Sequence, residues 1–116
     1  MELYLPELSV NRKRAINLLN KKAGGSFLLR KSDKSDKYVV TAKAISGKQK
    51  YAHYRVEEET YRGQKYYFIR KGEGFPSLLE LIAHHTTEFS LRYPVNSEGI
   101  FLHNNVYFKS LMQLSS

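Results

Sequence analysis

The sequence predicts a small α+β domain in which a central antiparallel β-sheet is flanked by two α-helices. The chain has 116 residues, which is the size of a single domain. Two segments with apolar residues at helical spacing enclose three or four segments of strand-like composition. The connections between the strand segments are shorter than the crossovers that parallel strands require, so an antiparallel sheet is expected.

The first helix is predicted over residues 10–22. Asn11 or Ser9 caps its start, and Gly24 and Gly25 end it. Its apolar residues at helical spacing are Ala15, Leu18 and Leu19. Charged residues occupy the other side, so the helix is expected to pack one face against the sheet.

The strands are predicted from runs of apolar, β-branched and aromatic residues that are bounded by polar segments. These runs cover residues 26–31, 38–45, 50–56 and 66–70. Loops or turns are expected at residues 31–37, 46–48 and 57–65. The three glutamates at the start of the last segment are expected to form part of a solvated loop.

The second helix follows Pro76, a residue that favours a helix start. Ser77 and Glu80 have the spacing of a capping box, and the helix is expected to end near His85. The order along the chain is therefore helix, strands, helix. We expect the two helices to cover opposite faces of the sheet.

The positive charge of the chain is concentrated in one half. The net charge is +8, from 19 Lys and Arg against 11 Asp and Glu. Residues 11–55 hold 13 of the basic residues and only two acidic ones, Asp33 and Asp36, which is a balance of +11. This asymmetry indicates an anionic partner, with nucleic acid, an acidic membrane surface and a phosphorylated protein as the candidates.

Composition also argues against several classes of chemistry. The absence of cysteine excludes disulfides, thiolate zinc sites and a cysteine nucleophile. His84 and His85 point about 100° apart on a helix, so we expect no metal and no cofactor. No serine-histidine-aspartate spacing stands out, and binding without catalysis is expected. The chain has no apolar run of membrane-spanning length and no signal-like start, so we expect a cytoplasmic location. We also expect a monomer.

Arg30 is the unusual residue of the predicted strands. It lies within an apolar run, on the same face as Leu28 by the alternation of strand side chains. A buried guanidinium requires an anion, because an unpaired buried charge is strongly unfavourable. One interpretation is an ion pair with a distant carboxylate such as Glu7 or Glu80. The other is a site for an anionic ligand.

The segments around Arg30 favour a ligand site. Ser32 opens a polar loop whose backbone N–H groups and hydroxyls can form an anion nest. His53 and Arg55 share one face of another strand, and Arg12 lies at the start of the first helix. We therefore expect three arginines from three elements to converge on one phosphate, since a planar guanidinium suits its paired oxygens.

Five blocks of the chain are informative when they are taken together. They are RKRAINLL at residues 12–19, GSFLLRKS at 25–32, YAHYRV at 51–56, YYFI with FPSLLELIAHH at 66–69 and 75–85, and LRYPV at 91–95. These blocks resemble the Src homology 2 family, whose members bind phosphotyrosine, and GSFLLRKS is similar to the family's signature strand. All five occur in the family's order, which makes the resemblance more specific than any single block.

The resemblance implies a phosphotyrosine-binding adaptor and a role for each site residue. Arg30 would grip two phosphate oxygens, Arg12 and Arg55 would flank the ring, and His53 would support the pocket floor. The loop residues that would hydrogen-bond the phosphate are Ser32, Asp33, Lys34 and Ser35. The residues that would line a pocket for the peptide beyond the tyrosine are Tyr54, Ile69 and His85. The expected partners are tyrosine-phosphorylated proteins.

The chain departs from the family pattern near both ends. It has no tryptophan, whereas the family usually opens with one before the first helix. Only TTEFS, residues 86–90, separates the second helix from the closing segment, so we expect modest selectivity for peptide flanks. Residues 1–95 are expected to form the domain, and residues 96–116 an apolar-rich extension that packs on it as a hairpin or a helix.

Two other anionic partners stay open from the sequence alone. Basic residues interleaved with tyrosines are compatible with a single-strand nucleic-acid binder, but no zinc-finger, RNP-type or KH-type motif is present. Nucleic acid is therefore the less favoured partner. Membrane-lipid headgroups, including phosphoinositides, are compatible with peptide binding through the basic half and are expected to be secondary.

Overall fold

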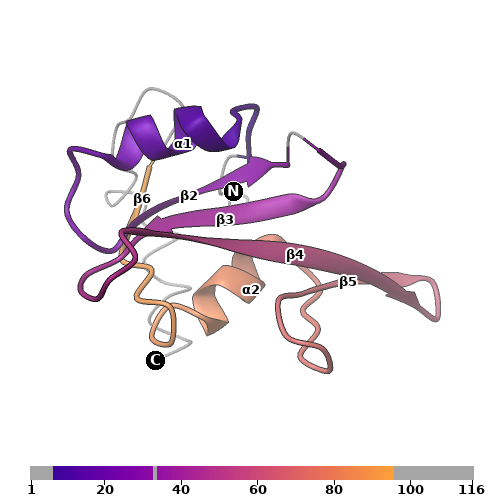
Figure 1. The fold of residues 1–116 in the computed structure, drawn as a ribbon. Coiled ribbons are helices and arrows are strands. Elements are labelled where there is room, and N and C mark those ends of the chain that lie inside the picture. The colour runs from indigo at the N-terminus through magenta and orange to yellow at the C-terminus, as the bar shows by residue number, and fades with distance from the viewer. Residues whose placement is uncertain (1–6, 33, 96–116) are drawn as a thin grey trace, which may run out of the picture.

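A computed structural model describes residues 7–32 and 34–95 of the chain, which fold as a sheet between two helices (Figure 1). The helices are α1 (Arg12–Leu19) and α2 (Leu78–His84). The strands are β1 (Glu7–Leu8), β2 (Ser26–Lys31), β3 (Tyr38–Lys43), β4 (Tyr51–Tyr61), β5 (Gln64–Phe68) and β6 (Tyr93–Pro94). The predicted α+β class is confirmed. The expected extension, residues 96–116, lies outside the described residues.

The centre of the sheet is antiparallel, in the order β2, β3, β4, β5. Two short parallel pairings, which the sequence did not predict, occur at one edge of β2. β1 pairs with Leu29 and Arg30, and β6 pairs with Ser26 and Phe27. The parallel pairing of β1 with β2 is possible because α1 provides the crossover between them.

The two helices cover opposite faces of the sheet, as predicted (Figure 1). Under α1 lies a cluster formed by Leu8, Ala15, Leu19, Leu28 and Val95. Under α2 lies a larger cluster formed by Phe27, Leu29, Val40, Ala42, Val56, Leu79, Leu81, Ile82 and Leu91. Neighbouring residues of β2 therefore serve different cores, because successive strand side chains point to opposite faces. Arg30 shares the α1 face with Leu28.

The helix ends follow the local chemistry of the sequence. Asn11 caps α1, with its Oδ1 accepting a hydrogen bond from the Arg14 N–H at 2.8 Å. The helix ends at Leu19, three residues before the predicted end and well before the glycines. Gly24 serves a different purpose, since a Cβ there would lie 2.8 Å from the Ile45 Cα. The chain therefore needs a residue without a side chain at this close approach.

The cap of α2 forms as the sequence predicts. The Glu80 N–H donates to the Ser77 Oγ at 3.1 Å, and the Ser77 hydroxyl donates to the Glu80 carboxylate at 3.0 Å.

Within the described part of the chain, no helix is long and apolar enough to cross a membrane.

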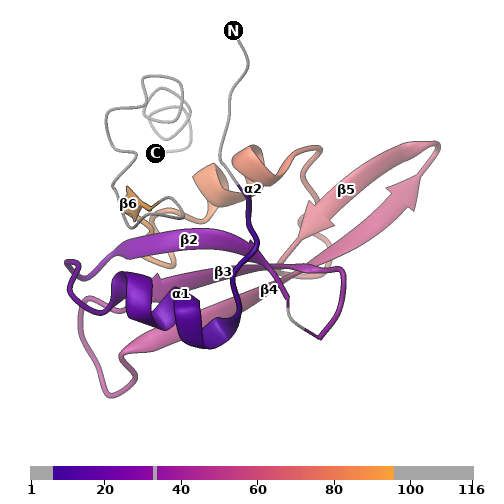
Figure 2. The same ribbon diagram turned by 90° about the horizontal axis from the view of Figure 1, so that it is seen from above.

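The predicted loop over residues 57–65 is wrong, because β4 and β5 form a long hairpin there. Arg62 and Gly63 have φ angles of 50° and 78°, as a two-residue hairpin turn with positive φ at both central positions requires. Glu58 pairs with Lys65 across the hairpin at 3.5 Å, which offsets the low strand propensity of the glutamates. Figure 2 shows the hairpin extending beyond the body of the sheet.

Candidate phosphate-binding site

A cavity of about 290 Å³ opens on the α1 face of the sheet. Its walls are Arg12, Arg30, Ser32, Lys34, Val39, His53 and Arg55. The strand register explains this grouping, since Arg30 pairs with Val39 and Val39 pairs with Arg55. These three residues form one row across β2, β3 and β4 on a single face. The start of α1 and the loop between β2 and β3 complete the walls.

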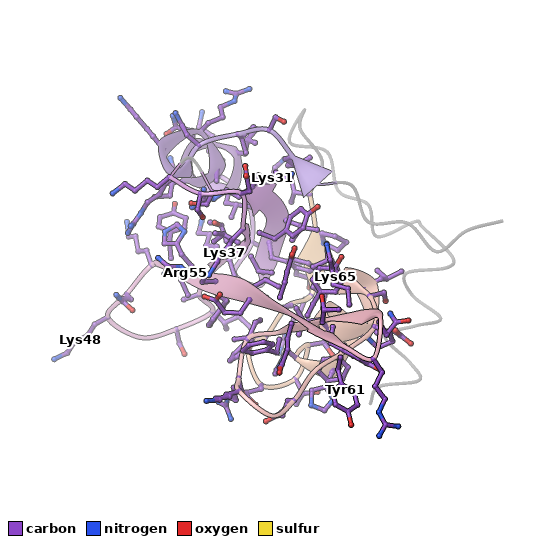
Figure 3. All side chains as sticks on the ribbon, turned by 90° about the vertical axis from the view of Figure 1, so that its right-hand side faces the viewer. Lys31, Lys37, Lys48, Arg55, Tyr61 and Lys65 are labelled. Atoms are coloured by element: carbon purple, nitrogen blue, oxygen red, sulfur yellow. The ribbon has the colours of Figure 1, made fainter. Side chains whose placement is uncertain are left out.

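Six of the eight residues predicted for phosphate contact lie together in this cavity: Arg12, Arg30, Ser32, Lys34, His53 and Arg55. Ser35 is exposed and does not line the cavity; its Oγ accepts a hydrogen bond from the Lys37 N–H at 3.3 Å. Asp33 lies outside the described residues. Figure 3 shows Lys48 pointing away from the domain at the turn after β3, whereas Arg55 lies beside the sheet.

Arg30 is the deepest cation of the cavity, with only 3% of its surface exposed. Its Nε–H donates a hydrogen bond to the Thr41 Oγ1 on the neighbouring strand at 3.0 Å. That bond fixes the plane in which the guanidinium lies. The sequence alternative of an ion pair with Glu80 is wrong, because Glu80 is exposed on α2 and its carboxylate binds Ser77. The side chain of Glu7 lies outside the described part of the structure.

His53 is joined to Arg30 through the same threonine. The Nδ1 of His53 lies 2.9 Å from the Thr41 Oγ1. The pKa of His53 is lowered from its ordinary value, mainly by burial and further by the charges of Arg12 and Arg30. The imidazole is therefore neutral at physiological pH. Sequence reasoning missed Thr41, although a hydroxyl residue within the apolar run YVVTA is the signal that marks it.

The loop after β2 is closed by its own hydrogen bonds. The Ser32 N–H donates to the Lys37 carbonyl at 2.8 Å, and the Lys34 N–H donates to the Ser32 Oγ at 3.2 Å. Lys37 also forms an ion pair with Glu57 on β4. These contacts hold Ser32 and Lys34 at the rim of the cavity.

The charge of the cavity favours a multiply charged anion. Its described walls carry four cations, Arg12, Arg30, Lys34 and Arg55, and no carboxylate. Cations from separate elements can approach one ligand from several sides, and charge-assisted hydrogen bonds are the strongest of their kind. Within the residues that the structure describes, no group of three or more potential metal ligands occurs.

The residues predicted to line a second pocket, Tyr54, Ile69 and His85, lie on the α2 face of the sheet. The ring of Phe89 stacks on Tyr54, with centroids 4.1 Å apart, and on His85, with centroids 4.8 Å apart. Ile69 packs against the α2 cluster. A neighbouring cavity is lined by Tyr54 and Phe89 but by neither Ile69 nor His85. Sequence reasoning treated the Phe89 segment only as a short loop.

Comparison with known proteins supplies a family and a related structure. A family model described as the SH2 domain matches residues 8–85. The chain is similar in fold to the VAV1 SH2 domain, whose solution structure was determined in complex with a tyrosine-phosphorylated peptide from SLP76. The TM-score is 0.58 at 21% identity, over 80% of this chain and 70% of that one. No curated protein gave a match to the chain.

Proposed function

Because the chain belongs to the SH2 domain family, we propose that it is an adaptor module that binds tyrosine-phosphorylated proteins through the cavity on the α1 face. The observation that carries the proposal is Arg30, a buried cation held by Thr41 among three further cationic wall residues. A phosphotyrosine brings about 1.5 to 2 negative charges and three acceptor oxygens to such a site. Unmodified tyrosine brings neither.

The proposed role of Arg30 is to bind two phosphate oxygens at once. Its Nε–H is committed to Thr41 in the structure, so the two terminal nitrogens present the edge that faces the phosphate. Arg12 and Arg55 flank the aromatic ring from α1 and β4. Ser32 and Lys34 contribute a hydroxyl and an ammonium donor from the loop.

The proposed role of His53 is to support the floor rather than to exchange protons. Its lowered pKa keeps it neutral, and its contact with Thr41 leaves the hydroxyl in place behind Arg30. We propose that no catalysis takes place at the site, and that the bound protein is released unchanged.

A pocket for peptide residues after the phosphotyrosine stays a proposal of its own. Tyr54 and His85 lie on the α2 face with Phe89 between them, and the partly buried Ile69 packs against the core cluster under α2. This arrangement supports recognition that is dominated by the phosphotyrosine, with modest contributions from its flanks.

The test is a calorimetric titration with three peptides of one sequence that carry tyrosine, phosphotyrosine or phosphoserine. Only the phosphotyrosine peptide should bind well, because phosphoserine lacks the ring that spans the depth of the cavity down to Arg30. Equal binding of the two phosphopeptides would instead indicate a shallow anion patch. Parallel titrations with single-stranded oligonucleotide and with phosphoinositide vesicles distinguish the other two anionic partners.

A further inference from the structure

Tyr61 is the most exposed tyrosine of the described chain. It keeps 59% of its surface in contact with solvent, whereas Tyr93, the other exposed tyrosine among the described residues, keeps 37%. Neither core cluster of the described chain includes Tyr61. The guanidinium of Arg62 lies 5.3 Å from the centre of its ring. The burial of apolar surface therefore does not explain why an aromatic side chain stands at this position.

The hairpin of β4 and β5 carries Tyr61 away from the body of the sheet (Figure 2). Tyr61 pairs with Gln64 at the last position of the hairpin, directly before the turn. Figure 3 shows its side chain pointing away from Arg55, a wall residue of the phosphate cavity. Tyr61 is six positions after Arg55 on one strand, and a strand rises about 3.3 Å per residue, which places them roughly 20 Å apart. Tyr61 therefore cannot reach the cavity of its own copy.

An acidic run comes directly before this tyrosine. Residues 57–59 are three glutamates, of which Glu59 is exposed. Arg62 and Lys65 bring the balance of residues 57–66 to −1, whereas residues 11–55 have a balance of +11. A phosphate on Tyr61 would add about 1.5 to 2 negative charges to the hairpin tip. The tip would then be complementary in charge to the basic half of a second copy.

Phosphorylation of Tyr61 requires access to its hydroxyl and a segment that can open in a kinase. The side chain is exposed, and the Tyr61–Gln64 pair is the end of the hairpin ladder, where local opening costs least. The Tyr61 oxygen forms a bond to the γ-phosphorus of a nucleoside triphosphate as the bond to the diphosphate breaks. The diphosphate leaves, and the phenolic proton passes to a base of the kinase.

Resting on the proposed function, we propose that Tyr61 is a phosphorylation site and that its phosphotyrosine binds in the α1-face cavity of a second copy of the chain. The described walls of that cavity carry four cations and no carboxylate, and Arg30 lies deepest among them. The exchange is reciprocal, so one dimer contains two such contacts. The second contact forms at a high effective concentration once the first has formed. Unmodified Tyr61 lacks the phosphate oxygens, so phosphorylation switches the association on.

The first measurement identifies the modified residue. The folded chain is treated with ATP and a tyrosine kinase domain that accepts acidic residues before its target, and mass spectrometry follows the occupancy of each tyrosine. Tyr61 should be modified faster than Tyr93, which is less exposed and pairs with β2. A chain in which Tyr61 stays unmodified, or is modified more slowly than Tyr93, would overturn the assignment of the site.

The second measurement is the mass of the phosphorylated chain by sedimentation. At a concentration about tenfold above the Kd for a free phosphotyrosine peptide, most of the chain should have about twice the monomer mass. An excess of that peptide should return it to the monomer. Tyr61→Phe treated with the kinase should stay monomeric, and Tyr93→Phe, the matched control, should associate as the wild type does. Association of the treated Tyr61→Phe variant would overturn the proposal.

A mixing experiment then tests whether the phosphate of one copy enters the cavity of the other. Phosphorylated Arg30→Ala should be monomeric by itself, yet form a one-to-one complex with unphosphorylated Tyr61→Phe, whose cavity is intact. Arg30→Lys replaces Arg30→Ala if the alanine variant does not fold. A phosphorylated wild type that stays monomeric but binds the free phosphotyrosine peptide after Tyr61→Phe substitution would overturn this inference alone. Failure of the unphosphorylated wild type to bind any phosphotyrosine peptide would refute the proposed function.

Discussion

The Nε–H of Arg30 donates a hydrogen bond to the Oγ1 of Thr41 at 3.0 Å, across the neighbouring strands β2 and β3. The same hydroxyl lies 2.9 Å from the His53 Nδ1, so one threonine organises residues of three strands. A buried guanidinium is useful as a phosphate ligand only if its orientation is fixed before the ligand arrives. Thr41 provides that fixation from a position that does not itself line the cavity.

Replacing Thr41 by valine should therefore weaken phosphopeptide binding without loss of the fold. Valine keeps the shape and strand propensity but removes the hydroxyl, so Arg30 loses its orienting bond and His53 its partner. One lost hydrogen bond to a charged group corresponds to about 1.5–3 kcal/mol, or roughly a tenfold to hundredfold loss of affinity. Calorimetry measures it, with Thr60→Val on the exposed hairpin as the control. Unchanged affinity in Thr41→Val would contradict the orienting role.

Arg55→Ala should reduce the preference for an aromatic phosphate. If Arg55 lies against the ring, its removal costs the cation–π contact, which is about 0.5–2 kcal/mol. The measurement compares phenyl phosphate with methyl phosphate as competitors of a labelled phosphopeptide. If Arg55→Ala lowers the affinity for phenyl phosphate and for methyl phosphate by the same factor, Arg55 acts only through its charge on the phosphate.

The domain should lose stability as the pH falls below about 6.5. Burial lowers the pKa of His85 below its ordinary value of 6.5, with His84 and Arg70 lowering it further and Glu88 and Glu73 opposing. The pKa of His53 is also lowered from its ordinary value, mainly by burial. Below pH 6.5 the unfolded chain binds more protons than the folded one, so the free energy of unfolding decreases with acidification. His85→Phe should make this decrease shallower, as measured by thermal unfolding from pH 7.5 to 5.

His84→Gln is the control for that experiment, since His84 is half-exposed and lies 3.3 Å from Glu73. Because burial, and not the charge of His84, is the main cause of the lowered His85 pKa, this variant should keep most of the acid-dependent loss. A wild-type stability that does not change between pH 7.5 and 5 would contradict the destabilising contribution of the buried imidazoles.

Gly24→Ala should destabilise the domain by about 1–3 kcal/mol, the usual cost of forcing atoms into a packed site. The new Cβ would lie 2.8 Å from the Ile45 Cα and 2.9 Å from the Ala44 carbonyl oxygen, which are backbone atoms that cannot turn aside. Chemical denaturation measures the change. Lys48→Ala, in the turn after β3, is the control. An equal loss of unfolding free energy in both variants would show that the close approach at Gly24 is unimportant.

The sequence predicts the elements of this fold better than their connections. Apolar periodicity and caps correctly indicate both helices, because Asn11 and the Ser77–Glu80 pair act locally. The hairpin after Val56 was missed because its glutamates have low strand propensity, and their stabilising partners lie on another strand. The sequence does not predict the parallel pairings of β1 with β2 and of β6 with β2, because each spans only two residues and depends on how the rest of the chain folds.

For the candidate site, too, the sequence indicates the residues whose local pattern is unusual and not those whose contacts are long-range. Arg30 stands out in the sequence because a cation within an apolar strand is unusual. Thr41 and Phe89 do not stand out. The contact of Thr41 with Arg30 depends on the strand register, and the stacking of Phe89 on Tyr54 depends on the return of the segment after α2 to β4. Both contacts join residues that are distant in the sequence.

The most direct test of the proposed phosphotyrosine site is a titration of Arg30→Ala with a phosphotyrosine peptide, beside Arg30→Lys and Arg62→Ala. A bidentate arginine makes two charge-assisted bonds of about 1.5–3 kcal/mol each, so Arg30→Ala should weaken binding at least about a hundredfold. Arg30→Lys should restore little, because an ammonium lacks the planar pair of donors. Arg62→Ala, which removes the same charge from the hairpin tip, should bind as the wild type does. Near wild-type affinity in a folded Arg30→Ala variant would contradict the account.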